Sequence, residues 1–350
     1  MTPRRCAWTV LMTLGLAGTA LGQAADQIVL IPGSAVKGPG GRVRGQVQSE
    51  TPAEVKIGLG ANTQTVPVDQ IQSIVYGGQP AGIALAESRE AAGALAEAAE
   101  LYKKAIAEAG GKPFVVLACQ FNQARVLAEL ALADPTKAAE ATALLETFAR
   151  VGSTSRHLAP ALELLARLQL QKGDNDPAEQ TVKKLAALPG GADRAAILKG
   201  RVLARKGDAE QAIKEFDAII AAAPEGSAKR RGAQLAKAEG LASLKKYPEA
   251  EALLREVIKA SAPEDAPAQA LAYNTLGDCL LAANQPKAAL LAYLRTDILY
   301  SKDKEHHPRA LAQIARLWRD LKRDDRADEV LERLKQEYPQ SSYLSGAARR

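Results

Sequence analysis

Residues 196–224 read AILKGRVLARKGDAEQAIKEFDAIIAAAP and decide the fold of most of this chain. Apolar residues recur every three or four positions on both sides of the polar turn KGD, which predicts two amphipathic helices joined by a short turn. Gly200 lies in the first helix, Ala212 opens the second, and Phe216 follows one turn later. Pro224 ends the unit, so the stretch is expected to form a helical hairpin.

The spacing of this hairpin recurs along the chain. A small residue is followed twelve positions later by another small residue, and four positions after that by a large apolar one. The matching sets are Ala86, Ala98 and Tyr102; Ala166, Ala178 and Val182; Gly200, Ala212 and Phe216; Ala238, Ala250 and Leu254; Gly277, Ala289 and Tyr293; and Ala315, Ala327 and Leu331. Six sets in register indicate a repeat architecture.

Small residues at these points let paired helices approach closely, and the large residue one turn later fills the adjacent hollow. The pattern resembles the tetratricopeptide repeat. This resemblance implies a mainly α fold, a solenoid of about seven helical hairpins over residues 83–340. The unit between about 114 and 151 is expected to be two helices with a degenerate signature.

Residues 26–77 form a different, β-rich module in front of the repeats. Five short runs rich in β-branched residues, QIVLI, RVRGQVQ, AEVKIGL, TQTVPV and QIQSIVY, are separated by turn-forming stretches. Nine apolar residues are expected to fill one face of a curled antiparallel sheet: Val43, Val47, Val55, Ile57, Val66, Val68, Ile71, Ile74 and Val75.

The spacing of these runs weakly resembles small Sm-like or SH3-like barrels. The module is expected to be either a cap packed on the first repeat or a separate binding module. Residues 78–82, which include Gly78 and Pro80, are the predicted linker to the helices.

The first 22 residues have the pattern of a signal peptide. Arg4 and Arg5 precede an apolar stretch of about sixteen residues, and small residues follow it at the positions that a signal peptidase reads. The alternative is a segment that is retained as a membrane anchor, although the run is short for a span. Export to the periplasm or another extracytoplasmic space is therefore expected, with no stable membrane span after cleavage. Residues 341–350 are the predicted C-terminal tail.

The charge balance argues against nucleic acid as a partner. The chain has 46 basic and 40 acidic residues, and 44 basic residues remain if Arg4 and Arg5 are removed. These are spread along the chain, and aromatic residues make up only 4% of it. Nucleic-acid binding would require a concentrated basic face, often with stacking aromatics.

Candidates for catalysis or metal binding are poor. No G-x-S-x-G, H-E-x-x-H, phosphate-loop or C-x-x-C pattern occurs. His306 and His307 form the one histidine cluster and are expected to face water in a polar loop, and His157 is expected to be structural. Cys119 and Cys279 lie in apolar segments of distant repeats and are expected to be buried, free thiols. We predict no enzyme activity, no cofactor and no metal.

The resemblance also implies where a partner would bind. In this family the first helices line a concave groove, and side chains next to the small contact position, or one turn before it, point into that groove. The corresponding residues are Arg167, Ile197, Arg201, Leu235, Glu239, Asn274, Asp278 and Arg316.

The sequence therefore predicts an exported protein-protein interaction scaffold or assembly factor of the cell envelope, which holds a segment of a partner protein in this groove. The alternative is a ligand-binding accessory subunit in which the β module recognises an envelope component.

Overall fold

The computed structural model describes residues 24–133, 135–339, 341, 343 and 344. The predicted signal peptide lies outside the described residues, as does most of the predicted C-terminal tail. No helix in the described part of the chain combines the length and apolar character that a membrane crossing requires.

The N-terminal module is a five-stranded antiparallel sheet with strand order β4-β3-β2-β1-β5. The strands are β1 (Asp26–Leu30), β2 (Arg42–Glu50), β3 (Glu54–Leu59), β4 (Asn62–Pro67) and β5 (Ile71–Val75). Each predicted run overlaps one of them, which confirms a small antiparallel sheet. Strand β1 lies between β2 and β5, and its Ile28 pairs with Val43 on one side and with Ile74 on the other.

The predicted apolar face of the sheet is correct in most positions and wrong in one. Five of the nine residues are buried and three are partly buried, but Val75 is 47% exposed. Successive residues of a strand point to opposite faces, so Val75 cannot share a face with Ile74. Ile28 and Leu30 of β1, which the prediction omitted, are buried in this core.

The rest of the described chain forms helical hairpins. The helices are α1 (Gly82–Ala91), α2 (Leu95–Glu108), α3 (Pro113–Ala133), α4 (Ala138–Val151), α5 (Leu158–Lys172), α6 (Asn175–Ala186), α7 (Gly191–Arg205), α8 (Ala209–Ala222), α9 (Ala228–Ser243), α10 (Tyr247–Ala260), α11 (Ala266–Ala282), α12 (Pro286–Leu299), α13 (His307–Asp320) and α14 (Asp324–Glu337). Within the described residues they pair as seven successive hairpins, and each packs on the next. The predicted solenoid is confirmed.

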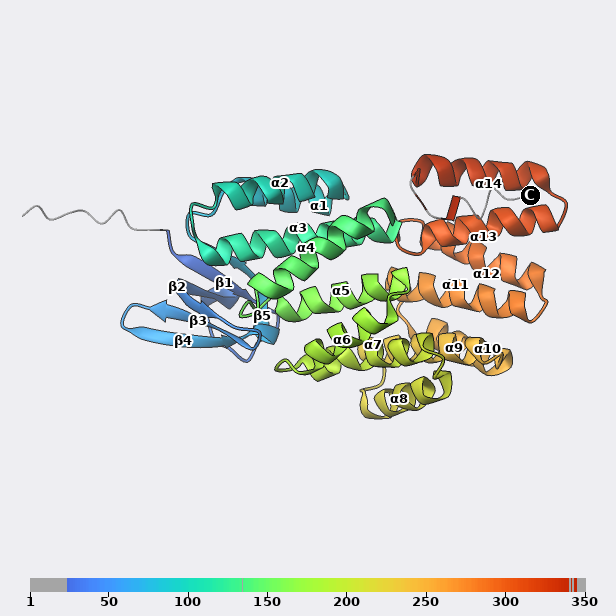
Figure 1. The fold of residues 1–350 in the computed structure, drawn as a ribbon, viewed down its shortest axis with the longest axis horizontal. Coiled ribbons are helices and arrows are strands. Elements are labelled where there is room, and N and C mark those ends of the chain that lie inside the picture. Colours follow the sequence, from blue (N-terminus) through green and yellow to red (C-terminus); the bar gives the residue numbers. More distant parts are fainter. Residues whose placement is uncertain (1–23, 134, 340, 342, 345–350) are drawn as a thin grey trace, which may run out of the picture.

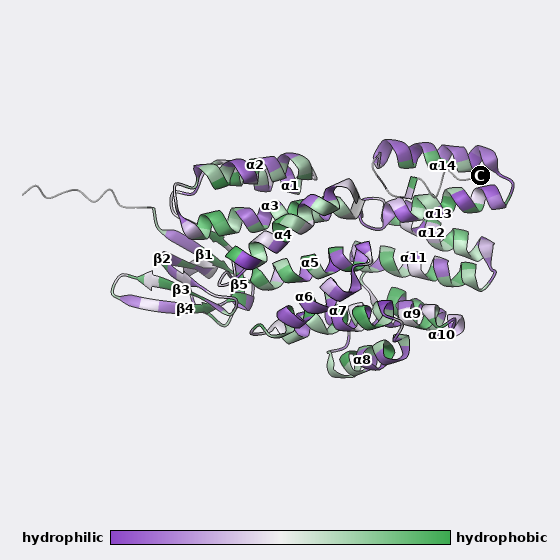
Figure 2. Ribbon diagram, viewed as in Figure 1, coloured by the Kyte–Doolittle hydropathy of each residue, from purple (hydrophilic) through white to green (hydrophobic). Residues whose placement is uncertain are grey.

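The hairpins wind into a superhelix whose last units return towards its first (Figure 1). The Nζ of Lys304, in the loop between α12 and α13, donates a hydrogen bond of 3.2 Å to the carbonyl of Gly93, between α1 and α2. The sheet lies at one end of the array (Figure 1). Apolar residues are concentrated on the faces that meet other elements, whereas α14 is largely hydrophilic (Figure 2).

The predicted signature positions are the points of closest packing. All the signature residues are buried. A Cβ added to Gly200 would lie 2.3 Å from the Phe216 ring, and one added to Gly277 would lie 2.5 Å from the Tyr293 ring. The large residue therefore occupies the space that the glycine leaves, as the spacing predicted.

The degenerate second hairpin differs in length. α3 has 21 residues, more than any other described helix, and a 3-10 turn (Pro135–Lys137) precedes α4. Ala141 and Leu145 keep the buried second-helix positions, but Glu129, twelve residues before Ala141, lies in a part-exposed ion pair with Arg125. The longer first helix breaks the twelve-residue spacing while preserving the hairpin.

The sheet packs directly on the first repeats. Its buried residues belong to the same apolar cluster as those of α1 to α5. The ring of Tyr76 stacks on Phe114 of α3 with centroids 6.5 Å apart. Lys112 Nζ donates hydrogen bonds of 2.8 Å to the carbonyls of Gly77 and Gly78. This packing supports the interpretation of the module as a cap on the array.

A buried polar cluster reinforces this junction. Glu50, at the end of β2, is buried, accepts a hydrogen bond from the hydroxyl of Tyr76 and lies 3.7 Å from Arg156 Nε in the loop before α5. Burial raises the pKa of Glu50, and the charge of Arg156 opposes that rise. The sheet is thus attached to the second and third hairpins by polar as well as apolar contacts.

Candidate partner-binding cavity

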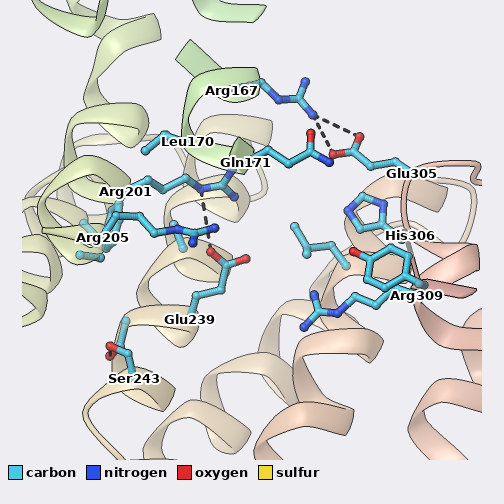
Figure 3. A pocket seen from close by; sticks show the side chains of 16 residues that line it. Arg167, Leu170, Gln171, Arg201, Arg205, Glu239, Ser243, Glu305, His306 and Arg309 are labelled. Atoms are coloured by element: carbon cyan, nitrogen blue, oxygen red, sulfur yellow. Dashed lines mark hydrogen bonds and ion pairs between the residues drawn. The ribbon is translucent and has the colours of Figure 1, made fainter. Parts of the chain in front are cut away.

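The first helices of the last five hairpins enclose a cavity on the inner side of the superhelix. α5, α7, α9, α11 and α13 contact one another in sequence. The space between them has a volume of about 390 Å³, and we call it the inner cavity. The charged side chains lining it are Arg167, Arg201, Arg205, Glu239, Glu305 and Arg309 (Figure 3).

An ion pair closes one side of the inner cavity. Arg167 on α5 donates from Nη2 to both carboxylate oxygens of Glu305, at 2.8 and 3.1 Å. Glu305 belongs to the loop between α12 and α13, which the superhelix brings back to α5. On the opposite side in Figure 3, Arg201 and Arg205 extend from α7.

The lining has an excess of positive charge. Four arginines face two glutamates. Arg201 Nε lies 3.9 Å from the Glu239 carboxylate, is buried and has no hydrogen-bond partner among the residues described. Arg205 is exposed and forms no side-chain ion pair within the described ranges. Guanidinium groups in this state are suited to bind carboxylates, which they contact through two parallel hydrogen bonds.

Arg309 is held at the edge of the cavity by an acidic neighbour. Its guanidinium pairs with Asp278, which also accepts a hydrogen bond of 2.6 Å from the Tyr293 hydroxyl. Burial opposes the charged form, but the Asp278 carboxylate raises the pKa of Arg309, so the guanidinium stays charged.

The structure brings only some of the predicted site residues together. Arg167, Arg201 and Glu239 line the inner cavity, and Asp278 contacts it through Arg309. Arg316 is exposed on α13 but is not part of the lining.

The other three predicted residues contribute to packing. Ile197 is partly buried in the apolar cluster of α7, α8 and α9. Leu235 and Asn274 are buried, and Asn274 donates a hydrogen bond of 2.9 Å to the carbonyl of His306. The interpretation of Leu235 and Asn274 as groove-lining is therefore wrong, because both side chains are buried.

Sequence reasoning missed Arg205, Glu305 and Arg309. Arg205 follows Arg201 by one helical turn, so helical periodicity could have identified it. Glu305 has no local signal, because its position depends on how far the superhelix turns between α5 and α13.

The prediction that the histidine pair faces water is wrong. His306 and His307 are buried at the start of α13. His307 Nε2 lies 2.9 Å from the Asp297 carboxylate of α12, and its Nδ1 lies 2.9 Å from the Tyr338 hydroxyl after α14. His306 Nδ1 lies 2.9 Å from Asp303. The pair therefore joins the last two hairpins.

The remaining candidate groups are buried. Cys119 and Cys279 are buried free thiols, as predicted, and burial raises the pKa of each to about 11, which keeps them protonated at neutral pH. His157 stacks on Phe121 with ring centroids 4.5 Å apart, and burial lowers its pKa. In the part of the chain that the structure describes, no three His, Cys, Asp or Glu side chains gather as metal ligands would.

Comparisons with known proteins identify the repeats. The tetratricopeptide-repeat family model matches residues 161–227 and 235–304. A tetratricopeptide repeat protein from Parabacteroides merdae is similar in structure, with a TM-score of 0.51, 16% identity, and coverage of 77% of this chain and 98% of that one. A Rap protein complexed with competence and sporulation factor has a TM-score of 0.50 and 13% identity, and the match covers 76% of this chain and 79% of that one. No curated protein matches the sequence. At these identities the likeness concerns the fold.

Proposed function

We propose that this chain, which has the fold of a tetratricopeptide-repeat solenoid and matches that family over residues 161–227 and 235–304, is a protein-interaction scaffold that holds an acidic, extended segment of a partner protein in the inner cavity. The observation that carries the proposal is the excess of arginine in the lining, with Arg205 free of any ion pair in the described structure and Arg201 only weakly paired. A carboxylate-bearing segment would supply the missing acceptors.

The dimensions and the fold support this assignment. A volume of about 390 Å³ is at the lower end of the range for pockets that bury a ligand, and suits a short stretch of chain rather than a folded domain. The Rap protein of similar fold was crystallised with competence and sporulation factor, so a fold of this kind can hold another molecule. Our proposal that the bound segment belongs to a protein follows the use of such repeats in protein binding.

The double variant Arg201→Glu with Arg205→Glu is expected to reduce capture of the partner about tenfold or more, since it reverses two charges on one wall of the inner cavity. Full-length tagged protein is used as bait in its own cells, and each co-purified protein is quantified against the unmodified bait. Acidic segments of the captured protein are then synthesised, and their affinities are measured by fluorescence anisotropy.

Arg150→Glu is the matched control, because Arg150 is exposed on α4 and lies outside the cavity lining. Circular dichroism establishes that each variant retains its helices. Capture that is equal for the double variant and the control would rule out the inner cavity as the binding site.

We further propose that the scaffold acts outside the cytoplasm, in the cell envelope, after removal of residues 1–22. The support is the sequence pattern of Arg4, Arg5 and the apolar run that follows. The protein recovered from fractionated cells is expected in the envelope fraction with a mass that lacks residues 1–22, and a form without residues 2–22 is expected in the cytoplasm. An uncleaved chain recovered from the cytoplasm would contradict this proposal.

A further inference from the structure

A second surface, on the outer layer of the solenoid, has the features of a docking site. Seven large apolar side chains are exposed among the described residues, and three of them lie on α12. Leu291 is 65% exposed, Ile298 71% and Leu299 54%. Leu291 and Ile298 are two helical turns apart, so they share one face of α12. Clustered exposure of this kind differs from the scattered apolar residues of an ordinary surface.

Beside this face the structure has a groove. A cavity of about 430 Å³ lies between α10, α11 and α12. Its apolar wall includes Ile258, Tyr273, Leu280 and Leu291. Tyr273 is fixed by stacking on Tyr300, with ring centroids 6.2 Å apart. We call this the α12 groove. Figure 2 shows the hydrophobic character of α11 and α12 against the hydrophilic α14.

The charged residues that line the α12 groove are all positive. Arg255, Lys259 and Arg295 line it, and no acidic side chain of the described chain does. Arg255 pairs with Glu251 at 2.7 Å, whereas Lys259 and Arg295 form no ion pair within the described structure. An apolar floor with unpaired cations at its rim is complementary to a helix that is apolar on one side and acidic at its flanks.

We propose that the α12 groove binds an acidic amphipathic helix of a different protein, whose apolar side covers Leu291 and Ile298. A second copy of this chain is a poor occupant, because a symmetric contact through this face would place Arg295 and Lys259 against the same cations of the other copy. With two separate sites, the inner cavity and the α12 groove, one molecule could then hold two partners at once.

The proposal is tested with a synthetic helix about 15 residues long, carrying Leu at positions i, i+4 and i+7 with Glu at the flanks, and with the same peptide carrying Lys in place of Glu. Fluorescence anisotropy with the full chain is expected to show binding of the Glu peptide only. The double variant Leu291→Ser with Ile298→Ser is expected to weaken that binding about tenfold or more, since both anchors are lost. Both side chains are exposed, so the fold is retained.

Two control variants separate this surface from the rest of the molecule. Val151→Ser replaces an apolar side chain that is 54% exposed on α4, and Arg201→Glu with Arg205→Glu alters the inner cavity; both are expected to bind the Glu peptide normally. The second control also distinguishes failure of this proposal from failure of the inner-cavity proposal.

Three results would overturn the inference. One is no binding of the Glu peptide at about 1 mM, the weakest affinity that such a site could usefully have. Another is binding without the expected specificity, seen either as equal binding of the Lys peptide or as binding that Leu291→Ser with Ile298→Ser leaves unchanged. The third is a dimer in analytical ultracentrifugation that the same double variant dissociates, which would assign the α12 groove to a second copy.

Discussion

Phe216→Ala is expected to lower the free energy of unfolding by about 3–5 kcal/mol. The ring is fully buried in the hairpin of α7 and α8, and it fills the space above Gly200. Removing it leaves a cavity at a point where the two helix backbones cross closely. Urea denaturation followed by circular dichroism gives the size of the change.

The effect of Gly200→Ala depends on whether that ring is present. A Cβ at position 200 would lie 2.3 Å from the Phe216 ring, so the single variant is expected to lose about 1–3 kcal/mol through overpacking. In the Phe216→Ala background the clash is absent. There, Gly200→Ala is expected to be neutral or to stabilise by up to about 1 kcal/mol, because alanine favours a helix over glycine. Additive effects of the two changes would show that the glycine and the ring are not matched.

Asp297→Ala is expected to lower the free energy of unfolding by about 3–5 kcal/mol, as for other broken buried ion pairs. Its carboxylate accepts hydrogen bonds from Arg333 Nη2 at 2.8 Å and contacts His307 Nε2 at 2.9 Å. Without it, the fully buried His307 keeps its Nδ1 contacts with Tyr338 and Glu337 but has no partner for Nε2 among the described residues, and Arg333 loses its main partner. Glu256→Ala, an exposed change on α10, is the control and is expected to stay within about 0.5 kcal/mol.

The same carboxylate makes stability depend on pH in the acid range. Burial opposes ionisation of Asp297, but hydrogen bonds from His307 and Arg333 lower its pKa from 3.8 to about 2. Because the folded-state pKa is the lower one, the contribution of this group is complete above pH 3.8 and is lost as the pH falls towards 2. The asparagine side chain of Asp297→Asn does not ionise. The melting temperature of this variant is therefore expected to fall less than that of the unmodified protein between pH 3.8 and pH 2, which thermal melts across this interval measure.

The features that depend on short stretches of chain could be predicted from the sequence. The hairpin register follows from Gly200, Ala212 and Phe216, which meet across a single turn, and the five other sets behave in the same way. The alternation of apolar residues in β2 to β4 identified the core face of the sheet. Val75 was misplaced because a continuous apolar run, Ile74 and Val75, does not show which residue faces inward.

The residues that line the two proposed binding surfaces, the inner cavity and the α12 groove, could not be predicted in the same way. Glu305 reaches Arg167 across 138 positions of the chain, and this contact depends on the sum of small rotations between repeats of unequal length. His307 was misjudged because its neighbours in sequence are polar, while its partners are distant in sequence: Asp297 comes from the preceding hairpin and Tyr338 from the end of its own hairpin. The exposed face of α12 likewise becomes apparent only when α10 and α11 are in place.

The contact between Arg167 and Glu305 has a mechanical consequence. Each side chain is about a third exposed, and such pairs contribute only about 0–1 kcal/mol, comparable with thermal energy. A repeat array can bend at each junction between neighbouring repeats. The ion pair of Arg167 and Glu305 is one weak contact between α5 and the loop that precedes α13. The flexibility of the whole array, more than this ion pair, therefore determines how far apart α5 and the loop before α13 lie. A segment that enters the proposed site in the inner cavity would have to break this one weak ion pair to separate α5 from the loop before α13.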